Sequence, residues 1–107
     1  MLHVTTNSFE KEVTDSPIPV LVMFHALWCS KCAMMRPIVE DVAMRYEGRY
    51  RFCEVEIEES PNLADEFEAD IVPAFALFHN GTLLAFFSGL LDETVLEARL
   101  NEIFRNC

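Results

Sequence analysis

The spacing of apolar residues changes along the chain between the period of a strand and that of a helix. Residues 19–24 are apolar on both faces, which favours a central strand that is covered on both sides. Between Ser30 and Tyr46 the apolar positions recur at helical spacing, and a kink is expected at Pro37. Gly48 is expected to end that helix. The pattern therefore predicts a buried strand that leads into a long amphipathic helix.

The segments on either side of this unit continue the alternation of strands and helices. Residues 2–5 are a short strand candidate, and a brief helix follows through Val13. Residues 51–57 are predicted to form a strand, and residues 61–67 a short acidic helix that opens with proline. A strand, a helix and a second strand in this order predict a parallel pair of strands.

The last third of the chain contains a predicted hairpin and a final helix. The apolar runs 74–78 and 83–88 flank Asn80-Gly81, and these two residues adopt positive φ easily, which favours a tight turn between antiparallel strands. Asp92 is expected to cap a helix that extends to about residue 104. The predicted order is β-α-β-α-β-α-β-β-α, an α/β fold with a mixed sheet between helices.

Length and composition favour one globular domain. The chain has 107 residues, of which 51% are hydrophobic and 24% are charged, so we interpret residues 1–107 as a single domain. Its 18 acidic and 8 basic side chains give a net charge of -10, which argues against nucleic acid and anionic lipid as partners. The apolar runs match neither a membrane span nor a secretory signal, so a cytoplasmic location is expected.

Two cysteines lie where the predicted central strand gives way to the long helix, in the sequence Trp28-Cys29-Ser30-Lys31-Cys32. Free N–H groups and the positive end of the helix dipole favour a thiolate on Cys29, and Lys31 adds a nearby cation. Cys32 is one turn further along, so it can attack a mixed disulfide formed at Cys29. Cys29 is the candidate nucleophile and Cys32 the candidate resolving thiol. The alternative is a pair of buried, unreactive cysteines.

The cysteine motif and four further features resemble the thioredoxin family over nearly the whole chain. In chain order the matching residues are Trp28-Cys29-x-x-Cys32, Pro37 in the helix, Ile71-Val72-Pro73, His79-Asn80-Gly81 at the hairpin, and Gly89 before the last helix. The resemblance implies the thioredoxin fold, in which helices flank a mixed central sheet. It also implies that the two cysteines exchange disulfides with other proteins.

The resemblance also implies a substrate groove beside the cysteine pair. In this groove Pro73 would follow a cis peptide bond and face the sulfurs, and the backbone of Val72 would pair with an extended segment of the substrate. Trp28, Gly89 and Leu90 are expected to complete the groove. From the residues alone, Pro73 indicates only a turn or the start of a strand, and the alternative for Trp28 is an ordinary core aromatic.

Several residues near the cysteines depart from the family pattern. Ser30-Lys31 stands where the family usually has Gly-Pro. We expect the added cation to make Cys29 more acidic and the dithiol–disulfide couple less reducing. His25 and Leu27 also replace commoner residues before the tryptophan, and we expect them to alter the choice of partner.

The buried acid that the family carries on the central strand is replaced by Met23, so a proton acceptor for Cys32 is lacking. Glu54 on the neighbouring strand is the candidate for this function, either directly or through water. The alternative is that Glu54 faces solvent together with Glu56. Lys31 and Glu54 are therefore the residues expected to tune the thiols.

The other cysteines and the histidines indicate no further chemistry. Cys53 falls inside a predicted strand and is interpreted as a small buried hydrophobic residue. Cys107, the last residue of the sequence, is interpreted as a free thiol or a disordered one. His3, His25 and His79 lack the spacing of metal ligands, so no metal site is expected.

The leading hypothesis is a thiol–disulfide oxidoreductase that acts on protein disulfides and needs no bound cofactor. A separate thioredoxin reductase is the electron donor that the resemblance implies. The alternative is a redox-inert or redox-sensing binding module that uses the same groove, since the buried acid and the Gly-Pro pair are missing. A glutathione-dependent enzyme is disfavoured, because Gly89 is followed by Leu90 rather than by a second glycine.

Overall fold

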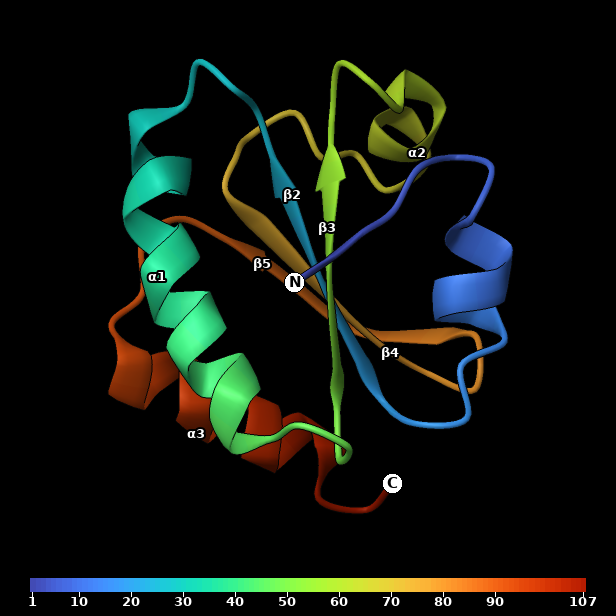
Figure 1. The fold of residues 1–107 in the computed structure, drawn as a ribbon, viewed down its shortest axis with the longest axis vertical. Coiled ribbons are helices and arrows are strands. Elements are labelled where there is room, and N and C mark those ends of the chain that lie inside the picture. Colours follow the sequence, from blue (N-terminus) through green and yellow to red (C-terminus); the bar gives the residue numbers. More distant parts are fainter.

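The computed structural model describes residues 1–107 as five strands and four helices (Figure 1). The elements in chain order are β1 (Leu2–His3), η1 (Glu10–Thr14), β2 (Val20–His25), α1 (Ser30–Arg45), β3 (Arg51–Glu56), α2 (Pro61–Glu66), β4 (Ala74–His79), β5 (Thr82–Ser88) and α3 (Glu93–Phe104). The short helix η1 is wound as a π-helix. The predicted order of strands and helices is confirmed.

The five strands form one sheet in the order β1-β3-β2-β4-β5. Strand β3 is parallel to β1 and β2, whereas β4 is antiparallel to β2 and β5. The predicted parallel pair and the predicted hairpin are therefore both present. The turn of the hairpin uses Asn80 and Gly81 at φ 53° and 76°, the positive values for which these residue types are suited.

Strand β2 lies in the middle of the sheet and is buried along its whole length. Its side chains alternate between two cores. Leu21 and Met23 belong to the core beneath α1 and α3, whereas Val20, Val22 and Phe24 belong to the core on the opposite face. Figure 1 shows α1 and α3 on one side of the sheet and η1 and α2 on the other. Burial on both faces explains why every residue of this strand before the last one, His25, is apolar.

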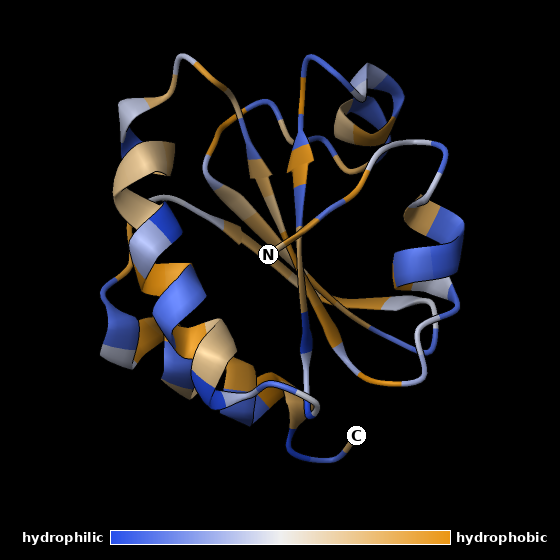
Figure 2. Ribbon diagram, in the orientation of Figure 1, coloured by the Kyte–Doolittle hydropathy of each residue, from blue (hydrophilic) through white to orange (hydrophobic).

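The long helices present an apolar side to the sheet and a polar side to solvent. Figure 2 shows both kinds of residue on α1 and mostly hydrophobic residues on the central strands. Met35 and Val39 of α1 are fully buried, and the helix continues through Pro37. Helix α3 begins as predicted, because the Asp92 carboxylate accepts a hydrogen bond from the Val95 N–H at 2.8 Å. None of the helices has the length and apolar character that a membrane crossing requires.

The topology brings three loops together at one edge of the sheet. Because β2 and β3 are parallel and β4 is antiparallel to β2, the carboxyl ends of β2 and β3 lie at the same edge as the beginning of β4. Strand β5 returns to this edge, where Ser88 pairs with Ala74. The loop from β2 to α1, the loop before β4 and the loop after β5 are therefore neighbours, as Figure 1 shows.

The two cysteines outside the motif differ in accessibility, which gives a test of the core. Cys53 on β3 is fully buried as predicted, and burial raises the pKa of its thiol to about 12. Cys107 is exposed. We expect an aromatic disulfide reagent at pH 8 to label Cys107 alone in the oxidised native protein, and both residues after unfolding. Rapid labelling of a native Cys107→Ser variant would contradict the burial of Cys53.

Candidate active site

Cys29 and Cys32 form a disulfide at the beginning of α1. Their Cα atoms are 5.2 Å apart, within the usual range for bridged cysteines. Cys29 is the residue that caps the helix, and its Sγ accepts a hydrogen bond from the Cys32 N–H at 3.1 Å. A backbone N–H of the first turn is thus directed at the Cys29 sulfur, where it stabilises negative charge.

The cysteine pair lies against the loop that precedes β4. The Val72-Pro73 peptide bond is cis, as the resemblance implied, and the carbonyl oxygen of Val72 is 3.7 Å from the Cys29 Sγ. Cys29 is 9% exposed and Cys32 is 3% exposed. A sulfur that arrives from solvent therefore has better access to Cys29 than to Cys32.

The residues expected to form a groove come from the three neighbouring loops. The Gly89 N–H donates a hydrogen bond to the carbonyl oxygen of Pro73 at 2.9 Å, which holds the loop after β5 against the loop before β4. Pro73 is buried, Val72 and Gly89 are half-buried, and Trp28 and Leu90 are exposed. The tertiary structure therefore brings these five residues to the edge of the sheet where the disulfide lies.

Trp28 is a surface residue and not a core aromatic. It is 67% exposed, and its indole N–H donates to the Glu58 carboxylate at 2.8 Å. Leu27 on the same loop and Ile71 on the loop before β4 are exposed as well. The sequence analysis did not predict that Ile71 is a surface residue. Its apolar side chain in the loop before β4 was a signal that could have indicated a binding surface. Exposed apolar side chains gathered in this way are typical of a binding surface.

The two residues expected to tune the thiols lie in different surroundings. Lys31 is exposed on the first turn of α1. Glu54 on β3 faces α1 rather than open solvent, and its carboxylate binds the guanidinium of Arg36. Partial burial raises the pKa of Glu54, but the hydrogen bond and the charge of Arg36 outweigh burial and hold that pKa below its ordinary value. The Glu54 carboxylate is therefore ionised at neutral pH.

Met23 and His25 occupy the α1 side of β2, close to the cysteines. Met23 is fully buried in the same core as Cys29 and Cys32. His25 is 6% exposed, and its Nε2 atom has no hydrogen-bond partner in the protein. The imidazole of His25 therefore lies beneath the surface, and its effect on the choice of partner stays a prediction.

A cavity of about 140 Å³ adjoins the disulfide. His25 lines it from β2, Cys32 and Arg36 line it from α1, and Cys29 lines it from the position that caps this helix. Sequence reasoning did not connect these residues, because Arg36 and His25 are brought together only by the packing of α1 on the sheet. The cavity places an imidazole, a guanidinium and both sulfurs around one small space.

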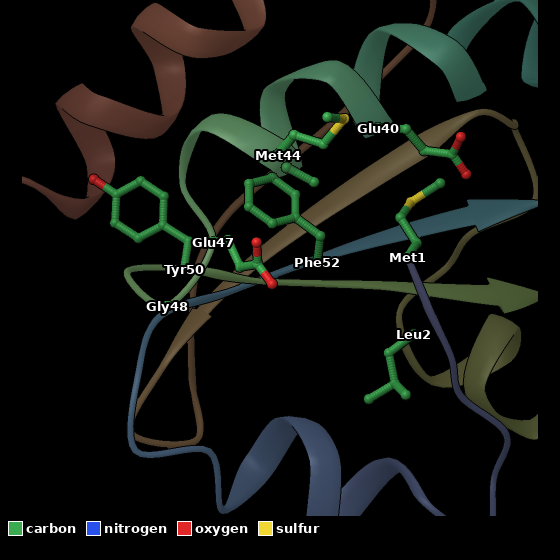
Figure 3. A pocket seen from close by; sticks show the side chains of 9 residues that line it. Met1, Leu2, Glu40, Met44, Glu47, Gly48, Tyr50 and Phe52 are labelled. Atoms are coloured by element: carbon green, nitrogen blue, oxygen red, sulfur yellow. The ribbon is translucent and has the colours of Figure 1, made fainter.

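Two larger pockets lie away from the cysteines. One of about 500 Å³ is near the C-terminal end of α1, and Figure 3 shows Met1, Met44 and Phe52 around it. The other, of about 740 Å³, lies beside α2 and has an acidic lining. Neither is lined by a cysteine, and no group of three or more His, Cys, Asp or Glu side chains is arranged to hold a metal ion.

Comparison with known proteins decides the family. The chain matches the family model described as Thioredoxin over residues 1–102. It is 34% identical over 100 residues to Thioredoxin 1 of a Nostoc species, with 94% of each chain covered. Thioredoxins of Allochromatium vinosum and Acidithiobacillus ferridurans are 36% and 39% identical to it over 101 residues, again with 94% of each chain covered. The chain belongs to the thioredoxin family.

Family membership and the cysteine pair together establish the type of chemistry. As a member of the thioredoxin family with a Cys29–Cys32 disulfide, the protein is a dithiol thiol–disulfide oxidoreductase. Its mixed sheet between helices is the thioredoxin fold that the resemblance implied.

The ion pair between Arg36 and Glu54 should stabilise this thioredoxin-family protein in a pH-dependent way. Because the pKa of Glu54 in the folded state is below 4.5, the stabilisation is present above pH 4.5 and is lost as the pH falls through the lowered pKa. Glu54→Gln should lower the free energy of unfolding by about 1 kcal/mol at pH 7 and by less at pH 3. Urea denaturation measures this, with the exposed Glu47→Gln as control. Equal losses at both pH values would contradict the assignment.

Proposed function

We propose that the protein reduces disulfides of other proteins by a two-step exchange at Cys29 and Cys32. The Cys29 thiolate attacks one sulfur of the substrate disulfide, and the other substrate sulfur leaves as a thiolate that takes up a proton. Cys32 then loses its proton and attacks the Cys29 sulfur of the mixed disulfide. The second substrate sulfur leaves with the electron pair of the broken bond, and the Cys29–Cys32 disulfide closes.

The observation that carries this proposal is the position of the Cys29 sulfur at the beginning of α1. There it accepts the Cys32 N–H at 3.1 Å, and a thiolate in this position is stabilised by the helix dipole. Cys32 is 3% exposed, so it reacts most readily with a sulfur that is already attached to Cys29. The outer sulfur therefore suits the attack on substrate, and the inner sulfur suits its release.

The proposed substrate site is the groove of Trp28, Val72, Pro73, Gly89 and Leu90. The carbonyl oxygen of Val72 is 3.7 Å from the Cys29 Sγ, so an extended peptide that pairs with the Val72 backbone brings its own sulfur next to Cys29. The exposed side chains of Trp28 and Leu90 offer apolar contacts to the residues on either side of that sulfur. The net charge of -10 favours partners with neutral or basic surfaces.

Lys31 and Glu54 are proposed to tune the site without touching the substrate. Lys31 adds a positive charge to the first turn of α1, which favours the thiolate of Cys29. The carboxylate of Glu54 is held by Arg36, so its charge acts on the site through Arg36 and through His25, whose pKa it raises.

The proposed electron donor is a thioredoxin reductase, and the proposed location is the cytoplasm. Both are supported by membership of the thioredoxin family, and a protein that reduces disulfides works in a compartment where thiols stay reduced. Coupling the purified protein to thioredoxin reductase and NADPH tests the donor. Turnover supported by glutathione and glutathione reductase alone would contradict it.

Reduction of insulin by dithiothreitol tests the two thiol roles. The wild-type protein should accelerate the reaction, and Cys29→Ser should abolish the acceleration because the attacking thiolate is lost. Cys32→Ser should accumulate a mixed disulfide that mass spectrometry detects. Cys107→Ser removes a thiol outside the site and should keep the wild-type rate. Absence of turnover by the wild-type protein would contradict the proposal and favour a redox-inert binding module.

The cation of Lys31 should make this couple less reducing than that of thioredoxin, for which about -270 mV is typical. The reason is that a stabilised Cys29 thiolate favours the dithiol form over the disulfide. Equilibration with glutathione buffers measures the potential. Lys31→Gln should make the couple more reducing, whereas Lys11→Gln on η1, the matched control, should leave it unchanged. A wild-type potential as low as that of ordinary thioredoxins would refute the effect.

A further inference from the structure

The second step of the exchange has to remove a proton from a buried thiol. Cys32 is 3% exposed and lies in an apolar core with Met23 and Met35. A thiol becomes a good nucleophile only when it loses its proton, and burial disfavours a thiolate that has no nearby partner. A group that accepts the proton therefore has to lie close to Cys32.

His25 is the titratable side chain that β2 brings to this place. The alternation of side chains along a strand puts His25 on the same face as Met23, toward α1. His25 shares the cavity of about 140 Å³ with Cys29, Cys32 and Arg36. Glu54 does not line this cavity. The imidazole is therefore better placed than the carboxylate to exchange a proton with Cys32.

The Nε2 atom of His25 is available for this purpose. It is buried and has no hydrogen-bond partner in the protein, a condition that is rare for a buried polar atom and often has a functional reason. A neutral imidazole carries an acceptor lone pair on one ring nitrogen and an N–H on the other. The cavity has room for a water molecule that could bridge an imidazole nitrogen and a thiol.

The groups around His25 keep it neutral at pH 7. Burial lowers the pKa of His25 below its ordinary value of 6.5. Glu54 and Glu56 on β3 raise it, Arg36 on α1 and His3 on β1 lower it, and the net shift is downward. Neutral imidazole accepts a proton at pH 7 and loses this ability as the pH falls through the lowered pKa.

We propose that His25 is the proton acceptor for Cys32 and works through a water molecule in this cavity. The inference rests on the proposed function. In the mixed disulfide, the water takes the proton of Cys32 and gives one of its own to Nε2, and the Cys32 thiolate attacks the Cys29 sulfur. The substrate sulfur leaves with the electron pair of the broken bond. The imidazolium then returns the proton to the leaving thiolate, and His25 is neutral again.

Single-turnover reduction of a disulfide-containing peptide separates the two steps. With reduced protein, the observed rate rises with peptide concentration while the attack of Cys29 limits it, and then reaches a plateau set by the attack of Cys32. His25→Gln keeps a polar side chain that cannot take up the proton. We expect this variant to lower the plateau at pH 7 about 10- to 100-fold and to leave the concentration-dependent rate within about twofold of wild type.

The pH dependence of the plateau distinguishes a proton acceptor from a structural residue. In the wild-type protein the plateau should fall as the pH decreases below 6.5, the ordinary pKa of the imidazole, and His25→Gln should lack this dependence. His25→Glu restores a group that accepts protons and should recover part of the lost rate with a different pH profile. His79→Gln is the matched control, because His79 lies at the opposite end of the sheet, and it should change neither step.

Four results would overturn the proposal. The first is a His25→Gln variant with the wild-type plateau and pH profile, and the second is an equal loss in both steps. The third result does not depend on whether the variant folds. It is an NMR titration of the wild-type imidazole, in the reduced protein, that shows His25 charged at pH 7. Loss of the acidic dependence in Glu54→Gln but not in His25→Gln would also overturn it, since Glu54 would then be the acceptor.

Failure of this inference is distinguishable from failure of the proposed function. If the proposed function fails, the wild-type protein does not reduce the peptide at all. If only the inference fails, the wild-type protein reduces the peptide with both steps measurable, and the substitutions at His25 leave the plateau unchanged.

Discussion

The burial of strand β2 constrains every part of the site. This strand is paired on both edges and covered on both faces, so each of its side chains belongs to one of two cores and its path has little freedom. It ends at His25, and a short loop then leads into the first turn of α1. Because α1 packs on the same face as His25, the helix terminus, the cysteines and the imidazole meet at one edge of the sheet.

The two sulfurs lie in contrasting environments, and the contrast supports the separate roles proposed for them. Cys29 caps a helix, where backbone N–H groups stabilise negative charge. Cys32 lies one turn deeper in a core that Met23 makes apolar at this point. In the proposed mechanism a thiolate on the outer sulfur is therefore stabilised by the backbone itself. In the proposed mechanism the inner sulfur depends on a neighbouring side chain, and His25 and Arg36 line the cavity in which such a side chain acts.

Most of the fold was predictable because it depends on short-range patterns. The apolar run of β2, the helical spacing in α1, and the Asn80-Gly81 turn each encode their element within a few residues. The family resemblance placed the cis bond before Pro73 next to the cysteine pair, a contact that no local pattern indicates. Elements with local signals were therefore predicted from the residues, and the assembly of the three loops was predicted only through the family.

The details that the sequence did not reveal are those that depend on distant residues packing together. From the sequence, Trp28 could be interpreted as a core or a surface residue. Only the tertiary structure showed that its side chain is exposed. Glu54 could be interpreted as a proton acceptor for Cys32 or as a solvent-facing residue, and only the packing of α1 brings Arg36 to its carboxylate. The sequence did not indicate the surroundings of His25, and the face of β2 on which it lies is covered by α1. The local periodicity of apolar residues determined the helices and strands, and the cysteine motif determined which two sulfurs react. Tertiary packing decided which charged and titratable groups surround them, since burial and pairing arise only when the helix docks on the sheet.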